Sequence, residues 1–428
     1  MLATSIKDLA GLSYFRRRAM LNLSTRVVTR LGRPDAFYHA PSADFKRLSG
    51  SYTPARFSQF ASDLRSAQLT VKGNEIPNNR LGPCAEDEFP PISAKTYKGL
   101  LEAGKAAFRN GEIGAVILAG GTASRLTKNK IFWEIEGGKT LLQLKLYATI
   151  GRAREGGIDI PLYIMTSPAT RHDVVKMANE LGYEEGIDFM VSDQSMLPVL
   201  TPGGEMVGFN ERILFAPTGH GAVFPTMQNT GVLDWMAKRG VKYVVQSNID
   251  NPLVALDSQD SNPFLAYVGY HANAEREITA QVSRKEPLFM GGIPLWYKPE
   301  EGKRRLAIIE TNQIEPKYLE QFNSLLPYFN PLTLIYNLGF LRKFDAARLP
   351  VVVIEREDKD PNSGEVILKY VKLETMSGSI TMAEPANFLP DTIPGVYREG
   401  MFTQLKGLDQ LEAWKARLVS RFPDFFKA

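Results

Sequence analysis

Short apolar runs alternate with longer amphipathic stretches along the centre of the chain. The runs GAVILAG, PLYIMTS, VKYVVQSNID and LAIIET are rich in strand-forming residues. Between them, TLLQLKLYATIGRARE, ATRHDVVKMANELG and NTGVLDWMAKRG repeat apolar residues at helical spacing. This alternation predicts an α/β fold, with a Rossmann-like mixed, mainly parallel sheet flanked by helices. The carboxyl ends of its parallel strands would share one edge, where ligands bind.

The flanking regions have different patterns. Residues 1–110 are predicted to be mostly helical and end in SAKTYKGLLEAGKAAFRNGEIG, where Gly111 or Gly114 would stop the last helix. Residues 346–428 combine the strand-like runs LPVVVIER and VILKYVKLET with the helical LKGLDQLEAWKARLVSRF. The sequence therefore predicts a helical region over 1–110, a core over 111–345 and a small C-terminal α+β region over 346–428.

Composition sets limits on the function. The chain has 428 residues, more than the roughly 250–300 that one core supports, so two or three lobes are expected. The net charge is +4, from 51 Lys and Arg against 47 Asp and Glu, with no basic cluster typical of nucleic-acid binding. Cys84 is the sole cysteine, which fits a reducing compartment.

No run of about 18 uncharged apolar residues suggests a membrane span. The basic stretch 14–34 has no signal-peptide core and is interpreted as a surface helix. These patterns predict a cytoplasmic monomer or homodimer with neither nucleic acid nor membrane as a partner.

The segment AVILAGGTASRLTKNKIFWEI, residues 115–135, ends an apolar strand in two glycines. Glycines there let the backbone approach a ligand and turn its N–H groups towards an anion. Arg125, Lys128 and Lys130 follow and could reach a phosphate. A plain tight turn is the alternative. The spacing matches neither the dinucleotide-binding fingerprint nor the Walker A loop.

Polar residues also follow other predicted strands. Gln194 interrupts FMVSDQSMLPVL, His220 lies between two glycines in APTGHGAVFPT, and Asp250 ends VVQSNIDNP. Each has a structural explanation: a helix cap for Asp250, a loop histidine for His220, and a backbone hydrogen bond for Gln194. Their recurrence at strand ends favours a site. Asp250 suits Mg²⁺, which binds one or two carboxylates together with substrate phosphates.

At this point the sequence resembles the UTP–glucose-1-phosphate uridylyltransferase family and the related UDP-N-acetylhexosamine pyrophosphorylases. The resemblance rests on motifs in the family's order over residues 115 to about 411. It implies a nucleotide-sugar transferase fold, with 111–345 as the catalytic core and 346–428 closing the site. The motifs are the glycine pair with Arg125 and Lys130, QSMLP, GHGAVF…NTGVLDWMAKRGVKYVVQSNIDN, GG…RLAIIET, FN…NL and LKGLDQL.

The resemblance implies that a sugar 1-phosphate attacks the α-phosphorus of UTP, releasing pyrophosphate and forming a UDP-sugar with Mg²⁺ as cofactor. By this analogy Arg125, Lys130 and Lys406 are catalytic cations, facing the leaving pyrophosphate, the α-phosphate and a further phosphate respectively. Asp250 would hold the metal. Nucleotide-binding positions are Ala119, Gly120, Gly121, Gln194 and Gly219, the last two at the uracil edge. Substrate-binding positions are His220 (sugar phosphate), Asn251, Gly292, Glu310 (sugar hydroxyls), Asn330 and Asn337.

The sequence departs from the family pattern mostly on the acceptor side. Met290 stands where the family has a lysine, Ala222 where it has an aspartate, and Leu332 and Thr333 where it has two asparagines. The loop before Lys130 is about two residues shorter and carries Asn129 in place of proline. With 22 residues after Lys406, we expect no C-terminal β-helix within this sequence.

These departures leave several hypotheses open. The leading one is a UTP–sugar-1-phosphate uridylyltransferase with a UDP-glucose-like product. The same chemistry with another nucleoside triphosphate, a modified sugar or a sugar-like cyclitol 1-phosphate is an alternative. A non-catalytic nucleotide-sugar binding protein is the rival from another class, although it would not need a leaving-group cation. A dinucleotide dehydrogenase lacks the necessary glycine fingerprint.

Overall fold

The structure is a computed structural model that describes residues 23–90, 92–121, 130–257, 263–284, 291–325, 328–390 and 408–427. The chain forms two compact units, neither continuous in sequence. The first comprises Met1–Glu75, Gln194–Thr226 and Pro350–Met376. The second comprises Ile76–Asp193, Met227–Leu349 and Ser377–Ala428. No helix within the described ranges is long and apolar enough to cross a membrane.

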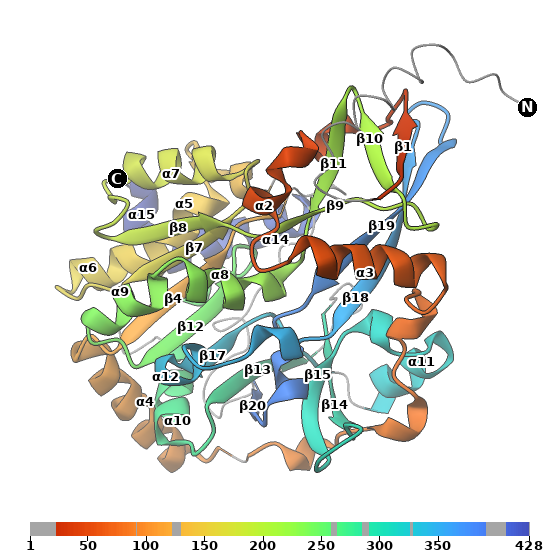
Figure 1. The fold of residues 1–428 in the computed structure, drawn as a ribbon. Helices are drawn as coiled ribbons and strands as arrows, with labels where there is room; N and C mark the ends of the chain where they lie inside the picture. Colours follow the sequence, from red (N-terminus) through yellow and green to blue (C-terminus); the bar gives the residue numbers. More distant parts are fainter. Residues whose placement is uncertain are drawn as a thin grey trace, which may run out of the picture. The chain divides into compact units, whose positions relative to one another are not determined.

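An eight-stranded sheet forms the centre of the second unit (Figure 1). Strands β4, β7, β8, β12, β13 and β20 run in one direction, and β16 and β17 run against them. This arrangement confirms the predicted mixed, mainly parallel sheet. In sheet order the strands are Tyr328–Phe329 (β16), Ile278–Arg284 (β13), Leu334–Asn337 (β17), Tyr243–Asn248 (β12), Ile113–Leu118 (β4), Leu162–Thr166 (β7) and Phe189–Asp193 (β8), and Asn387–Pro390 (β20) pairs with β13.

The register places the ends of the central parallel strands at one level. Leu118 of β4 pairs with Asn248 of β12 on one side and with Met165 of β7 on the other. We call this side of the sheet the carboxyl edge. Because β13 and β20 run in the same direction, they also end at the carboxyl edge.

Helices cover the sheet, and α4 and α5 begin at side-chain caps. Ser93 Oγ accepts a hydrogen bond from Thr96 N–H (3.1 Å) at the start of α4. Thr140 and Gln143 form a reciprocal capping box at the start of α5. The main helices of this unit are Ala94–Arg109 (α4), Leu141–Leu146 (α5), Arg152–Glu155 (α6), Arg171–Glu180 (α7), Val232–Lys238 (α9), Phe264–Asn273 (α10) and Leu408–Arg421 (α14), with a π-helical turn at Tyr147–Gly151 after α5.

Two glycines let α4 and α10 pack closely. A Cβ atom added at Gly104 would lie 1.8 Å from the carbonyl oxygen of Leu265, and one added at Gly269 would lie 1.8 Å from that of Leu100. Both neighbours are backbone atoms, which cannot move aside as a flexible side chain can. Apolar residues of α10, including Phe264 and Leu265, then join the core that covers β4.

A small antiparallel sheet also belongs to the second unit. It contains Leu81–Gly82 (β3), Ile293–Tyr297 (β14) and Arg305–Ile309 (β15), beside the helix Pro316–Leu325 (α11). The run LAIIET forms β15 and pairs with β14 rather than with the parallel strands. An apolar run predicts a buried strand but does not specify its partner.

The first unit is mainly β-structure. Five strands form one sheet: Thr25–Val28 (β1), Tyr38–Ala40 (β2), Met196–Pro198 (β9), Met206–Phe209 (β10) and Arg212–Pro217 (β11). A long hairpin of Val351–Lys359 (β18) and Val366–Thr375 (β19) belongs to the same unit, together with the helix Pro54–Arg65 (α3). Residues 23–75 are therefore less helical than the sequence predicted, because β1 and β2 find partners far along the chain. The basic stretch predicted as a surface helix instead contains strand β1 within its described part.

The close α4–α10 contact makes a testable prediction. Gly104→Ala should lower the free energy of unfolding by about 2 kcal/mol or more, because the added methyl group meets a carbonyl oxygen. Gly99→Ala in the same helix is the matched control, since a Cβ there has open space. That control should raise stability by about 0.5–1 kcal/mol. Urea unfolding of both variants measures the difference, and equal effects would contradict the close packing.

Candidate functional site

The glycine pair and Asp250 lie on neighbouring strand ends. Ala119, Gly120 and Gly121 follow β4, and Asp250 follows β12 two residues after the Leu118–Asn248 pair. The N–H of Ala119 continues the sheet by donating to Met165 O (2.8 Å). Gly121 is exposed, and a Cβ there would meet no atom within 4 Å. The structure thus brings the two predicted features together at the carboxyl edge.

Lys130 joins this cluster. Its Nζ atom lies 2.9 Å from Asp250 Oδ2, in an ion pair whose side chains are 21% and 7% exposed. The Lys130 ammonium also lies over the ring of Trp133, 5.7 Å from its centroid. Because the pair is largely shielded from water, its attraction is stronger than that of a surface pair. Two residues 120 positions apart in sequence therefore share one site.

The donor set at Asp250 bears on the expected Mg²⁺. Among the described residues, no three His, Cys, Asp or Glu side chains cluster to hold a metal. A single carboxylate fits Mg²⁺ when substrate phosphates and water complete the coordination shell. Asp250 therefore fits a metal that arrives with a nucleotide, rather than one held by the protein alone.

A buried lysine supports the segment that carries Asp250. Lys145 of α5 has no exposed surface, and its Nζ donates to the carbonyl oxygens of Asn251 (3.0 Å) and Val254 (3.1 Å). Burial lowers the pKa of Lys145 to about 7, against the opposing influence of Asp250. The sequence analysis missed this residue. Its signal was a lysine within the apolar run LLQLKLYATI.

Three predicted acceptor-side residues also come together in the second unit. Gly292 O accepts a hydrogen bond from Asn330 N–H (2.8 Å). A Cβ at Gly292 would lie 2.4 Å from Ile308 Cγ2 and 3.1 Å from Glu310 Oε1. A side chain at this position would therefore meet Ile308 first and would also crowd Glu310. Asn330 precedes β17, whose first residue pairs with Gln246 in the second half of β12, so this cluster lies towards the carboxyl edge.

Glu310 is a half-buried carboxylate that has no hydrogen-bond partner among the described side chains. Burial raises its pKa to about 7. A carboxyl group that titrates near neutral pH can accept or donate a hydrogen bond, which suits a hydroxyl-rich ligand.

Asn330 itself holds a strained turn. Its Nδ2 donates to Gln281 O (2.7 Å), and its Oδ1 accepts from Leu332 N–H (3.1 Å). Leu332 has φ +65°, a left-handed conformation that asparagine adopts more readily than leucine. Thr333 is 1% exposed, and its hydroxyl has no partner within the described residues. The Asn330 side chain therefore shapes the turn, rather than pointing freely at a ligand.

The first unit holds Gln194, Gly219 and His220. Thr218, beside Gly219, donates through N–H to the carbonyl oxygen of Ser195, the residue after Gln194 (3.0 Å). Gly219 has φ +85°, and a Cβ there would lie 2.4 Å from the carbonyl oxygen of Thr375, so glycine is required. His220 begins a 3₁₀ turn and is partly exposed. Gln194 and Gly219 are thus neighbours in this unit.

The structure separates one predicted residue from the others. Asn337 pairs with Tyr243, the first residue of β12, and donates through Nδ2 to Glu277 Oε2 (2.7 Å). It lies about 17 Å along the strand from Asn248, at about 3.3 Å per residue. We therefore leave Asn337 out of the candidate site.

Asn251 is buried after Asp250 and offers its carbonyl to Lys145. Arg125, Lys406 and Met290 lie outside the described residues.

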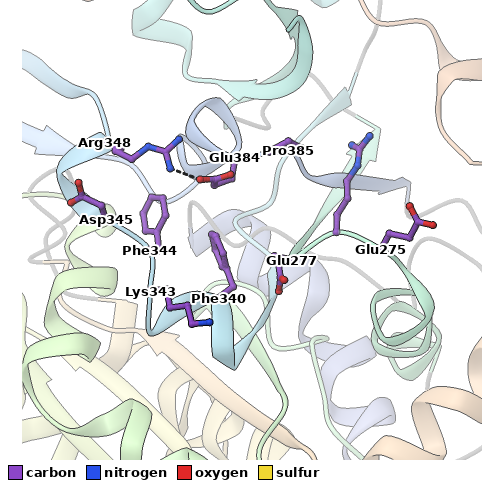
Figure 2. Close-up of a pocket in the computed structure, with 10 residues that line it drawn as sticks. Glu275, Glu277, Phe340, Lys343, Phe344, Asp345, Arg348, Glu384 and Pro385 are labelled. Carbon is purple, nitrogen blue, oxygen red and sulfur yellow. Dashed lines mark hydrogen bonds and ion pairs between the residues drawn. The ribbon is translucent and has the colours of Figure 1, made fainter. Parts of the chain in front are cut away.

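A cavity of about 440 Å³ also lies away from the carboxyl edge (Figure 2). Glu275 and Glu277 precede β13, and Phe340 and Phe344 follow β17, so the cavity is at the amino ends of the parallel strands. Figure 2 shows Arg348 paired with Glu384 in its wall. None of the predicted site residues lines this cavity.

The structure is an α/β fold with a mixed, mainly parallel sheet, and the glycine turn, Lys130 and Asp250 cluster at its carboxyl edge. A sequence model of the UTP–glucose-1-phosphate uridylyltransferase family matches residues 57–388. The chain belongs to this family.

The names of individual relatives refer to two different sugars. The chain is 30% identical over 217 residues to a probable UDP-N-acetylglucosamine pyrophosphorylase of Dictyostelium discoideum, covering 46% of this chain and 43% of that protein. It is 27% identical over 346 residues to a UTP–glucose-1-phosphate uridylyltransferase of Solanum tuberosum, covering 78% and 65%. The chain therefore spans less than two thirds of the length of these curated relatives.

Solved structures support the fold. A UDP-glucose phosphorylase of Trypanosoma brucei superposes with a TM-score of 0.63 at 21% identity, over 83% of this chain and 73% of that one. The uridine diphosphate N-acetylglucosamine pyrophosphorylase of the same organism, in complex with an inhibitor, gives 0.63 at 19% identity, over 98% and 80%. These likenesses show that the chain shares the fold of both kinds of pyrophosphorylase.

The raised pKa of Glu310 predicts a pH-dependent stability. Between pH 4.5 and 7 the unfolded carboxyl loses its proton before the native one, so Glu310 destabilises the protein increasingly as pH rises. Glu310→Gln should therefore stabilise the fold on the order of 1–2 kcal/mol at pH 8 and little at pH 4.5. Urea unfolding at both pH values measures this. Glu300→Gln, at an 86% exposed side chain, is the control and should show no such pH dependence. A uniform loss of stability in Glu310→Gln would contradict the prediction.

Proposed function

We propose that this protein is a uridylyltransferase that makes a UDP-sugar and pyrophosphate from UTP and a sugar 1-phosphate. The supporting observation is the Lys130–Asp250 pair at 2.9 Å beside the glycine turn, in a chain that belongs to the family. A phosphate oxygen of the acceptor would attack the α-phosphorus of UTP. The bond from that phosphorus to the bridging oxygen would break, and pyrophosphate would leave.

Each residue has a physical role in this proposal. Transfer of this kind depends mainly on positioning and on neutralising phosphate charge. The glycine turn lets the nucleotide approach the backbone, Lys130 neutralises the α-phosphate, and Asp250 ligates Mg²⁺ that is bound to the phosphates. Gln194, beside Gly219, offers both a donor and an acceptor to the uracil edge. Arg125, Lys406 and His220 are further cation and phosphate contacts suggested by the family resemblance.

In the free protein, Lys130 is paired with Asp250. In this proposal both residues are needed to bind the nucleotide and its metal. Binding of Mg²⁺ with UTP would exchange this one ion pair for two contacts, Lys130 to phosphate and Asp250 to metal. Both groups are then already in place when the nucleotide arrives. Catalysis of this kind benefits from charges that need little rearrangement.

The acceptor is proposed to be a hexose 1-phosphate. Glu310, with its raised pKa and its position beside Gly292, supports recognition of hydroxyl groups. The named relatives act on glucose and on N-acetylglucosamine derivatives, and both are hexose 1-phosphate chemistries. A cyclitol 1-phosphate or a different triphosphate would be separate outcomes of a substrate panel.

Pyrophosphate release tests the proposed function. The protein is mixed with Mg²⁺, with UTP, ATP, GTP or CTP and, in separate reactions, with the 1-phosphates of glucose, N-acetylglucosamine, galactose and a cyclitol. Release with UTP and at least one acceptor is expected, and Asp250→Asn should reduce it by at least 100-fold through loss of the metal ligand. Asp234→Asn, at an exposed acid of α9 paired with Arg342 (2.6 Å), is the control and should keep its activity. No release with any combination would favour a non-catalytic binding protein.

The turn at Leu332 predicts a change in acceptor preference. Leu332→Asn should relieve strain, raising stability by about 0.5–1 kcal/mol, and should add a polar group towards the acceptor cluster. We expect kcat/KM for glucose 1-phosphate to rise several-fold relative to the other acceptors. Leu332→Gly separates the two effects, because glycine relieves the strain without adding a polar group. Equal acceptor profiles in all three proteins would exclude Leu332 from acceptor recognition.

A further inference from the structure

Lys145 is a buried lysine among the leucines of α5. Its neighbours Leu141, Leu142, Leu144 and Leu146 are all fully buried, and Lys145 is buried with them. No carboxylate forms an ion pair with Lys145 among the described residues. Burying an ammonium group without a paired anion is costly, so an apolar residue would give the helix a more stable core.

The two hydrogen bonds of Lys145 reach a single loop. They end at the carbonyl oxygens of Asn251 and Val254, in the segment that follows β12 and carries Asp250. The same loop is tied to the π-helical turn through Leu256 N–H, which donates to Ala148 O (3.0 Å). Lys145 therefore holds the loop at the residues that immediately follow the proposed metal ligand.

Two lysines contact the turn that carries Asp250. Lys130 contacts its carboxylate directly at 2.9 Å, and Lys145 bonds to the carbonyl of the next residue. Lys130 is needed at the α-phosphate once the nucleotide binds, so its bond to Asp250 cannot hold the carboxylate throughout the reaction. Lys145 makes no bond that the nucleotide would replace.

We propose that Lys145 is a positioning residue, which holds the Asp250–Asn251 turn in place while Asp250 changes its partner from Lys130 to nucleotide-bound Mg²⁺. This proposal rests on the proposed function, because it assigns Asp250 to the metal. Lys145 does not touch the substrates. It acts through the two loop carbonyls to which its Nζ donates.

Lys145→Met tests the proposal, because methionine has similar length and no charge or donor. We expect the Mg²⁺ concentration for half-maximal rate to rise at least five-fold and kcat to fall at least ten-fold, with KM for the acceptor changed less than two-fold. The melting temperature should stay the same or rise, because a buried charge is removed. Lys105→Met, at a buried lysine of α4 that pairs with Glu102 (3.7 Å), is the control and should leave all the kinetic constants unchanged.

Lys145→Gln separates the hydrogen bonds from the charge, since its amide keeps two N–H donors. It should recover part of the rate lost in Lys145→Met. Unchanged Mg²⁺ dependence in a folded Lys145→Met protein would overturn the proposal. Failure of both variants to fold would also overturn it, by showing that Lys145 acts only in stability.

Calorimetry separates this proposal from the proposed function. UTP is titrated into the unmodified protein and into Lys145→Met, with and without Mg²⁺. Lys145→Met should weaken binding of UTP at least five-fold when Mg²⁺ is present and less than two-fold when it is absent. This readout does not need turnover, so an unmodified protein that binds UTP but releases no pyrophosphate would refute the enzyme and leave the role of Lys145 measurable. Equal weakening under both conditions would refute the positioning role.

Discussion

The parallel pairing of β4 with β12 is the contact on which the candidate site depends. Leu118 and Asn248 lie opposite each other, so the glycine turn and Asp250 both leave the sheet at the same level. Lys130 then contacts Asp250, although the two residues are 120 positions apart in the sequence. If this register slipped by one residue, the side chains of β12 would exchange faces and Asp250 would lose its place.

The site combines groups that are costly to the fold. A lysine without exposed surface, a half-buried carboxylate with a raised pKa, and a leucine at positive φ all lie in the second unit near the carboxyl edge. At each of these three positions a different residue would give a more stable fold. Strain and perturbed pKa values concentrate at functional sites because the surrounding structure holds them in place. Here the eight-stranded sheet and its buried helices supply that support.

The two positions where the family has asparagines lie in a tight turn: Leu332 has φ +65° and Thr333 is buried. The turn over Asn330–Thr333 is closed by the Asn330 side chain, so that residue contributes shape. Glu310 lies close to Gly292, and burial raises its pKa to about 7. In the proposed function this carboxyl group recognises the hydroxyl groups of the acceptor.

The sequence by itself determined the fold class, the central parallel strands β4, β7 and β12, and the positions of the glycine turn and Asp250. It did so because local apolar periodicity and glycine position depend on nearby residues alone. Only the tertiary structure decided which strands are neighbours, that LAIIET pairs with β14 rather than with the parallel strands, and that β1 and β2 join strands from residues 206–217. It also placed Asn337 at the sheet edge opposite the carboxyl edge, and it joined Lys145 to the loop that follows Asp250. Some of these contacts, such as β1 with β10 and Lys145 with Asn251, join residues more than a hundred positions apart. Their geometry follows from packing the whole unit, which no short stretch of sequence encodes.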